Sequence, residues 1–262
     1  MHRLPTSLRR RTTGFTLMEL LVVIAIILVL AVITLPVLDV VRQRGDKVKA
    51  VNVMRQLGTA TGIFASQNDN LLPGEGSVSL NSWNYYSDPA NSKAWCNALP
   101  RLMGMKGTAD FATTPQAFYT KENLLFLPGA VYPTTNVRLI KPLFPIGINS
   151  KLQRRSPDGS KISPRLNNIT NPGRTVLFLE RGMPSEKKSL PVLSKGDGSP
   201  KGNATDFIAR YSGQGVLCFV DGHAESFAAT DIVNSAGRTP FPPIDVIWCK
   251  TPEEDPNAPS PN

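Results

Sequence analysis

The sequence predicts an α+β protein in which a long N-terminal hydrophobic helix packs on a small antiparallel β-sheet domain. Apolar residues with helical spacing dominate residues 15–65, and short strand-like segments occur only in the second half of the chain. The composition is that of a globular protein, because 41% of the 262 residues are hydrophobic and 19% are charged.

The first 14 residues form a short basic segment. They contain Arg3, Arg9, Arg10 and Arg11 and no acidic residue, so removing them lowers the formal net charge from +9 to +5. The remaining positive charge is spread along the chain without a dense basic block or interleaved aromatic residues. We therefore expect no nucleic-acid binding.

An uninterrupted apolar run follows this basic segment. Residues 20–38 comprise 19 residues with no charge, and Thr34 is their only polar side chain. A helix of this length crosses the hydrocarbon core of a bilayer. The run is too long for the core of a secretory signal peptide, and no small-residue cleavage site follows it. We expect a single membrane span that stays in the mature protein.

Glu19 stands at the start of this run, where an ionised carboxylate is costly at full bilayer depth, by about 2.5–3.5 kcal/mol. The carboxylate could stay solvated among the lipid headgroups. Alternatively, a cut before Phe15 would create an α-amino group that neutralises Glu19 of a neighbouring subunit in a low-dielectric layer. The second arrangement would couple membrane insertion to assembly.

Residues 9–24, RRRTTGFTLMELLVVI, resemble the prepilin cleavage and methylation motif of type IV pilins and type II secretion pseudopilins. The resemblance combines a basic leader, Gly before the cut, Phe after it, Glu at the fifth mature position and a long apolar helix. It implies that residues 1–14 are a leader peptide ending at Gly14 and that Phe15 is the cleaved and N-methylated terminus. It also implies that Glu19 is the assembly carboxylate and that a prepilin peptidase makes the cut.

Charge alone does not orient the span. Arg42, Arg44, Lys47 and Lys49 follow it as closely as the leader arginines precede it, so the positive-inside rule is ambiguous. The resemblance implies a single-pass protein of the bacterial inner membrane, with the N-terminus cytoplasmic and the C-terminal domain periplasmic, or displayed at the cell surface in a filament.

The helix is expected to continue as an amphipathic segment to about residue 65 and to pack on a globular domain over residues 66–250. The apolar residues that return to one face are Val40, Val41, Val48, Val51, Met54, Leu57 and Phe64. We assign Met54, Leu57 and Phe64 to the domain core. Residues 251–262 are polar and rich in Pro, which is typical of a disordered tail.

Four short segments rich in branched and aromatic residues are expected to be strands: 175–180, 215–220, 223–227 and 244–249. Asp221-Gly222 separates the second from the third, and such a pair predicts a hairpin with a two-residue type I′ turn. The sheet should therefore be antiparallel.

Four aromatic residues, Trp83, Tyr85, Tyr86 and Trp95, lie in the turn-rich region after the helix. They could form a platform for a carbohydrate or another ligand. The edge of a hydrophobic core is the favoured interpretation, because no converging polar groups accompany them.

Residues 209–227, ARYSGQGVLCFVDGHAESF, are similar to the C-terminal signature of a bacterial family of pseudopilin-like proteins named for a His, nine residues and Asp-Gly. Asp221 and Gly222 match the signature, but Tyr211 replaces its His. Residues 64–74, 144–150 and 171–180 are also similar to that family. The replacement bears on any role that depends on the His and not on the fold.

The sequence contains no constellation that predicts catalysis. His223 is the only histidine after the leader, and no nucleophile elbow, phosphate-binding loop or C-x-x-C motif occurs. We expect no enzymatic activity and no obligatory cofactor. Asp221, His223 and Glu225 alternate and could share one face of a strand with a metal ion, but a turn residue and a half-exposed strand are the simpler explanation.

A glycine-rich loop provides candidate calcium ligands, Asp197, Asn203 and Asp206. The loop lacks the acidic spacing of an EF-hand, so an ordinary solvated turn is the alternative. The resemblance adds weight to calcium, since major pseudopilins often carry a C-terminal calcium site.

Cys96, Cys218 and Cys249 make an odd number of cysteines. In an oxidising compartment one disulfide and one free thiol are expected. Cys218 lies in an apolar run and should be a buried thiol. By elimination, the predicted disulfide joins Cys96 and Cys249.

These observations predict a structural subunit that is processed by a prepilin peptidase. It would assemble with copies of itself and other pilin-like subunits, through secretion or pilus assembly machinery, into a type II secretion pseudopilus or a type IV pilus-like filament. The alternative is a single-span, membrane-anchored extracytoplasmic binding protein for a polymer such as carbohydrate. The sequence leaves open whether the subunit is major or minor.

Overall fold

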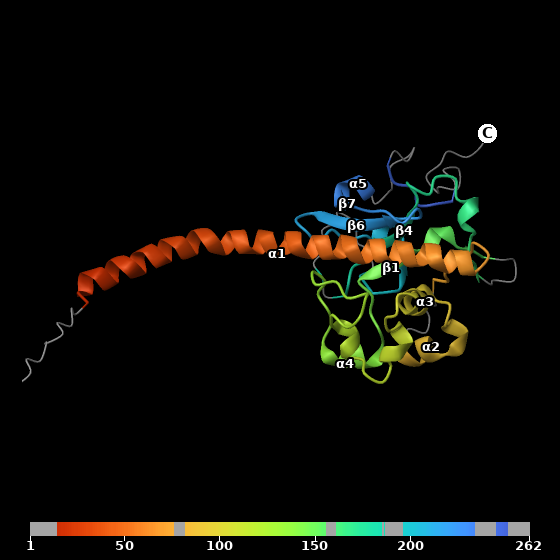
Figure 1. The fold of residues 1–262 in the computed structure, drawn as a ribbon, viewed down its shortest axis with the longest axis horizontal. Helices are drawn as coiled ribbons and strands as arrows, with labels where there is room; N and C mark the ends of the chain where they lie inside the picture. The colour runs from red at the N-terminus through yellow and green to blue at the C-terminus, as the bar shows by residue number, and fades with distance from the viewer. Residues whose placement is uncertain are drawn as a thin grey trace, which may run out of the picture. The chain divides into compact units, whose positions relative to one another are not determined.

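The computed structural model describes residues 15–75, 82–155, 161–184, 186, 196–233 and 245–250. The chain divides into two compact units, Met1–Arg42 and Gln43–Asn262. Helix α1 (Leu17–Gln67) contributes to both units (Figure 1). The predicted helix over residues 15–65 is therefore confirmed, with each end shifted by two residues.

In the second unit, one face of α1 enters the hydrophobic core. Ala50, Met54, Leu57, Ala60 and Phe64 are buried and recur every three or four residues, as one face of a helix requires. This confirms the assignment of Met54, Leu57 and Phe64 to the core. The buried face begins later than the apolar pattern suggests, because the valines at positions 40, 41 and 48 remain exposed.

A five-stranded sheet lies beside this helix, with strand order β5-β1-β4-β6-β7. The strands are β1 (Ile146–Asn149), β4 (Val176–Glu180), β5 (Lys201–Gly202), β6 (Gln214–Phe219) and β7 (Ala224–Ala228). All neighbours are antiparallel except β1 and β5, which are parallel. The α+β class is confirmed, but the sheet is mixed, because a two-residue edge strand has no sequence pattern that would reveal it.

The remaining elements are short. They are the α-helices α2 (Trp83–Ser87), α3 (Trp95–Leu102), α4 (Thr135–Ile140) and α5 (Ala229–Ile232), a separate pair of two-residue strands β2 (Arg154–Arg155) and β3 (Lys161–Ile162), and six 3₁₀ turns within the described residues.

The central sheet buries side chains on both faces. Val216 and Cys218 of β6 belong to the hydrophobic cluster that includes the buried face of α1. Leu217 and Phe219 belong to a second cluster, which includes Ile232 of α5. Successive side chains of a strand point to opposite faces, so β6 is buried on both.

Three of the four predicted strands are present as β4, β6 and β7. The fourth prediction was wrong for the described residues 245–250, where Ile247 forms only an isolated bridge with Thr175. β1 was not predicted, because two of its four residues, IGIN, are Gly and Asn, which are depleted in strands.

The hairpin between β6 and β7 is confirmed, but its turn is not the predicted two-residue type I′. The amide of Gly222 donates to the carbonyl of Phe219 (2.9 Å), and the amide of Phe219 donates to the carbonyl of His223 (2.9 Å). Only Gly222 has a positive φ, +92°, whereas a type I′ turn requires two such residues. The loop is thus longer by one residue, and Gly222 alone supplies the left-handed conformation.

Gly222 also contacts α1. A Cβ atom on Gly58 of α1 would lie 2.7 Å from the Cα of Gly222 and 2.8 Å from its carbonyl oxygen. Real Cβ atoms do not approach backbone that closely, so the absence of a side chain at Gly58 lets the hairpin turn meet the helix.

We predict that Gly58→Ala lowers the free energy of unfolding by about 1–3 kcal/mol, since the added methyl group must push the turn away from the helix. Urea unfolding of the full chain in detergent, followed by tryptophan fluorescence, measures this change. Gly62→Ala is the matched control, because a Cβ there meets nothing within 4 Å. It should be stabilising by about 0.5–1 kcal/mol, as Ala favours a helix over Gly.

Candidate functional site

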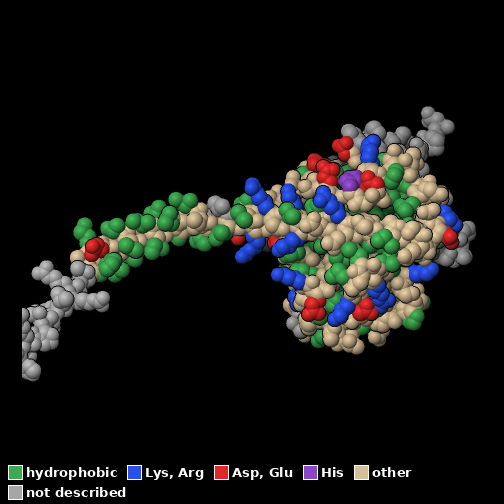
Figure 2. All heavy atoms as spheres, in the orientation of Figure 1, with side chains coloured by type: hydrophobic (Ala, Val, Ile, Leu, Met, Phe, Trp, Pro, Cys, Tyr) green, Lys and Arg blue, Asp and Glu red, His purple; other side chains and the backbone are tan. Residues whose placement is uncertain are grey.

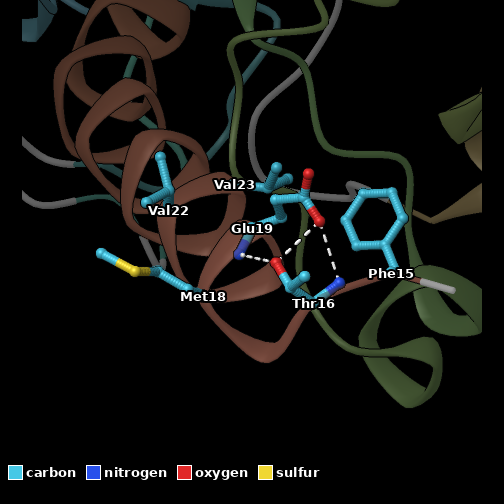
Figure 3. A pocket seen from close by; sticks show the side chains of 6 residues that line it. All are labelled: Phe15, Thr16, Met18, Glu19, Val22 and Val23. Atoms are coloured by element: carbon cyan, nitrogen blue, oxygen red, sulfur yellow. Dashed lines mark hydrogen bonds between the residues drawn. The ribbon is translucent and has the colours of Figure 1, made fainter.

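The candidate site is the first turn of α1 and the residue pair before it (Figure 3). The carboxylate oxygen Oε2 of Glu19 accepts hydrogen bonds from the amide (2.9 Å) and the hydroxyl (2.7 Å) of Thr16. The amide of Glu19 donates to the Thr16 hydroxyl oxygen at 3.2 Å. This reciprocal pattern is a capping box, which satisfies amide groups that the first helical turn leaves without a partner.

The capping box was missed in the sequence, although its signal is present. Thr16-Leu17-Met18-Glu19 has the T-x-x-E spacing, directly before an apolar run. The cap orients the Glu19 carboxylate toward the N-terminal end of the helix. Both of its hydrogen bonds from Thr16 go to Oε2.

An apolar surface surrounds this carboxylate. A shallow depression next to it is lined by Phe15, Thr16, Met18, Glu19, Val22 and Val23. The Phe15 and Leu17 residues are 76% and 82% exposed, so no other described part of the protein covers the site. A charged group in this setting attracts a cation strongly once water is excluded.

The rest of the first unit is an exposed apolar helix. The hydrophobic residues of α1 up to Leu35 are almost all exposed, and Figure 2 shows them as a continuous stretch. α1 is the only helix among the described residues that is long and apolar enough to cross a membrane. Thr34, its one polar side chain in the run, donates to the carbonyl of Leu30 at 2.9 Å and therefore presents no unsatisfied hydroxyl hydrogen to lipid.

The structure brings two of the three predicted processing and assembly residues together. Phe15 and Glu19 both line the depression at the start of α1. Gly14, the leader over residues 1–14 and the tail over residues 251–262 lie outside the described residues.

The calcium candidates surround an arginine. The guanidinium of Arg181 donates to Asp197 Oδ1 from Nε (3.2 Å) and from a terminal nitrogen (2.6 Å), and it lies 3.0 Å from Asp206 Oδ2. Asn203 instead accepts hydrogen bonds from the amide and hydroxyl of Thr205. The Arg181 side chain is only 4% exposed.

The positive charge between these acidic residues is therefore supplied by the chain itself. Within the described residues, no group of three or more His, Cys, Asp or Glu side chains is placed to hold a metal ion, the Asp221, His223 and Glu225 set included. Calcium binding by Asp197, Asn203 and Asp206 stays a prediction, and it would require a calcium ion to displace the Arg181 guanidinium.

The predicted disulfide is not formed. Cys96, Cys218 and Cys249 are all buried and none of them forms a disulfide, so only the expectation of a buried Cys218 thiol is confirmed. Cys96 belongs to the cluster that contains α1, whereas Cys249 follows Trp248 of the second cluster. Elimination among three cysteines carries no information on distance, which is why the pairing of Cys96 with Cys249 was wrong.

The aromatic residues after α1 do not form a binding platform. Trp83, Tyr86 and Trp95 are buried in the first hydrophobic cluster, and Tyr85 packs against it half-buried. The indole nitrogens of the two tryptophans donate to the backbone carbonyls of Arg138 (2.9 Å) and Pro200 (2.8 Å). The interpretation as core is confirmed.

Tyr211, which stands where the predicted signature has a His, lies in a buried hydrogen-bond network. Its hydroxyl donates to Glu180 Oε1 (2.9 Å), and the amide of Val216 donates to Glu180 Oε2 (2.8 Å). Arg210 lies 3.4 Å from Glu180 and makes a bidentate pair with Glu186 (2.8 Å for each bond). Burial raises the pKa of the Glu180 carboxyl, against the opposing effect of Arg210.

This network was not predicted. Its members come from positions about 30 residues apart, and no local pattern marks Glu180 or Arg210 as buried. Tyr211 therefore has a structural role in the core of the second unit.

Comparison with known families found one match, the prokaryotic N-terminal methylation motif, over residues 9–35. No curated protein and no solved structure matched the chain. The matched residues include the Gly14-Phe15 bond, Glu19 and most of the apolar run. The motif supports a type IV pilin-like precursor with a membrane-anchoring helix. The similarity of residues 209–227 to the His-nine-Asp-Gly family stays a prediction.

We predict that Arg181→Gln lowers the free energy of unfolding by on the order of 3 kcal/mol, because it leaves Asp206 partly buried without its cation. Calcium should restore part of this loss, and it should stabilise the variant more than the parent protein. Urea unfolding with calcium or with a chelator measures both effects.

Arg101→Gln is the control for that substitution. Its partner Asp110 forms an exposed ion pair, in which the two side chains are 42% and 38% exposed, so the loss should stay below about 1 kcal/mol. An equal response of both variants to calcium would contradict a role for the Asp197 and Asp206 pair.

We also predict that Tyr211→Phe destabilises the protein more at pH 8 than at pH 4, by about 1–3 kcal/mol at pH 8. Glu180 has a folded-state pKa above its ordinary 4.5, so its contribution to stability is full below pH 4.5 and is lost as the pH rises through the folded-state pKa. Removing the Tyr211 donor raises that pKa further and deepens the loss.

The measurement is urea unfolding of both proteins across this pH range. Tyr119→Phe is the control, because the Tyr119 hydroxyl donates to the neutral carbonyl of Lys141 (3.0 Å). Its effect should not change between pH 4 and pH 8. A Tyr211→Phe effect that is equally independent of pH would contradict an ionisable Glu180 in the network.

Proposed function

We propose that the chain is the precursor of a structural pilin-like subunit. In this proposal a prepilin peptidase cuts between Gly14 and Phe15, and Phe15 becomes the N-methylated terminus. The subunit then assembles with copies of itself and other pilin-like subunits, through secretion or pilus assembly machinery, into a type II secretion pseudopilus or a type IV pilus-like filament. The observation that carries the proposal is the methylation motif over residues 9–35, which coincides with an exposed apolar helix.

An exposed apolar helix of this length needs an apolar environment. Burial of apolar surface is favourable by about 25 cal/mol per Å², so a water-exposed stretch from Leu17 to Leu35 would be strongly unfavourable. A 19-residue run rises about 28 Å as a helix, which matches the hydrocarbon core of a bilayer. Lipid would cover the helix before assembly, and the helices of neighbouring subunits would cover it in a filament.

Glu19 supplies the charge that favours assembly over the isolated state. Cleavage before Phe15 creates an α-amino group, and the Phe15 amine of a neighbouring subunit could pair with Glu19 in the membrane. Within the described residues the Oε1 atom of Glu19 accepts no hydrogen bond, and an ionised carboxylate has about four acceptor sites. The carboxylate can therefore keep its cap and bind an amine.

The topology follows from the same processing. A prepilin peptidase that cuts on the cytoplasmic side would leave the N-terminus there and the second unit in the periplasm or on the cell surface. The subunit works by mechanical assembly and carries no catalysis in this proposal. The polymer-binding alternative loses its motivating feature, because Trp83, Tyr86 and Trp95 are buried.

We predict that the protein recovered from cells containing a prepilin peptidase begins at Phe15 and carries one extra methyl group. Intact mass and the sequence of the N-terminal peptide measure this directly. An intact Met1, or a cut after residue 38, would contradict the proposal.

We further predict that Glu19→Gln and Glu19→Ala are processed normally but do not assemble. Gln can still cap the helix, so loss of assembly in Glu19→Gln isolates the charge from the cap. Thr16→Ala is the matched control, since it weakens the cap and keeps the charge, and it should still assemble. Filament yield after shearing measures assembly, and assembly of Glu19→Gln at the parent level would refute the pairing of amine and carboxylate.

A further inference from the structure

Three basic side chains on α1, Arg44, Lys47 and Lys49, follow the apolar run and are here called the basic collar. Figure 2 shows Lys and Arg side chains gathered on α1 beyond its hydrophobic stretch. We propose that the basic collar binds the headgroups of anionic phospholipids. This inference rests on the proposed function, because it requires the apolar half of α1 to cross a bilayer.

The spacing along the chain places the collar at a membrane surface. Arg44 and Lys49 follow Leu38, the end of the apolar run, by 6 and 11 residues, which is a helical rise of about 9 Å and about 17 Å. The headgroup layer is roughly 5–7 Å thick, and long basic side chains extend toward it. The farther Lys49 still lies about a Debye length from the headgroups at physiological ionic strength.

The collar is available for binding. Arg44 is exposed, and the Lys49 side chain is 59% exposed and lies 3.6 Å from the carboxylate of the half-buried Asp46. Lys47 donates to the side chain of Gln214 at 2.8 Å, which leaves further ammonium hydrogens for a second acceptor. With Asp39, Arg42 and Asp46 included, residues 39–49 still carry a net charge of +2.

The angular distribution favours a lipid surface over a protein partner. At about 100° per residue, Lys47 lies about 60° and Lys49 about 140° from Arg44 around the helix, so Arg44 and Lys47 share one side and Lys49 points away from it. A plane of headgroups around a helix meets charges on several sides. The acidic face of a protein partner would match a stripe with spacing of three or four residues, and Lys49 lies outside the stripe that Arg44 and Lys47 begin.

The proposed topology places these basic side chains on the side of the membrane where such residues are unusual. They would lie on the outer side of the membrane, where Lys and Arg next to a span are depleted. Basic residues that are retained there need a stabilising partner, and an anionic headgroup supplies one, with an attraction that falls with salt.

The test uses the full chain reconstituted in phosphatidylcholine vesicles that contain spin-labelled phosphatidylglycerol or spin-labelled phosphatidylcholine. The fraction of motionally restricted spin label gives the preference of the protein for one lipid over the other. We expect about a threefold preference for phosphatidylglycerol at low salt, falling to near equality in 1 M NaCl. Arg44→Gln combined with Lys49→Gln should remove this preference.

The matched control neutralises two exposed lysines elsewhere, with Lys93→Gln and Lys121→Gln. It removes the same charge and should keep the preference. Near-UV circular dichroism checks that both double variants keep the parent fold, which we expect because the surface pair of Lys49 is worth little.

Three outcomes would overturn the inference. The first is a parent protein without lipid preference, and the second is a collar variant that keeps it. The third is a collar variant whose only change is weaker cross-linking between copies in pure phosphatidylcholine, which would assign the collar to an acidic surface of a second copy.

Resistance to alkaline extraction from pure phosphatidylcholine vesicles separates this inference from the proposed function. Extraction of the parent protein would contradict both the membrane span and the collar. A protein that resists extraction but shows no lipid preference would contradict the collar alone.

Discussion

The contact between α1 and the sheet is the interaction on which the second unit depends. Met54 and Leu57 belong to the same hydrophobic cluster as Val216 and Cys218 of β6, and Gly58 lets the β6–β7 turn approach the helix backbone. This single contact joins a segment at position 58 to one at position 222. Gly222 supplies the positive φ that the turn needs, and Gly58 supplies the absence of a side chain that lets the turn approach.

Buried ion pairs fix the arrangement of the loops around that core. Arg210 pairs with Glu186 and lies beside Glu180, and Arg181 pairs with Asp206, so two arginines inside the domain each meet carboxylates at close range. Desolvation offsets much of the energy of such pairs, so their main consequence is specificity, because wrong loop arrangements would leave an arginine uncompensated. Tyr211 belongs to this system, because it packs in the first hydrophobic cluster and donates a hydrogen bond to Glu180.

α1 serves two environments with one continuous helix. Beyond Gln43 one face is covered by the core of its own domain, whereas before Arg42 the apolar side chains lack any cover from the described residues. At the N-terminal end of the apolar run, hydrogen bonds from Thr16 hold the Glu19 carboxylate in place. At the C-terminal end, basic side chains follow the run. In the proposed function a membrane first covers the apolar surface, and the filament core then supplies the carboxylate with the amine of a neighbouring subunit.

The sequence by itself determined α1, the β4, β6 and β7 strands and the processing motif, because local periodicity or a few adjacent residues specify each of them. Glu19 and Phe15 were found in the same way, and the T-x-x-E cap could have been. Only the tertiary structure decided that β5 joins β1 in parallel, that Cys96 and Cys249 remain separate thiols, and that Arg181 lies between Asp197 and Asp206. These features arise from contacts between residues far apart in the chain, where neither spacing nor residue type specifies which groups will meet.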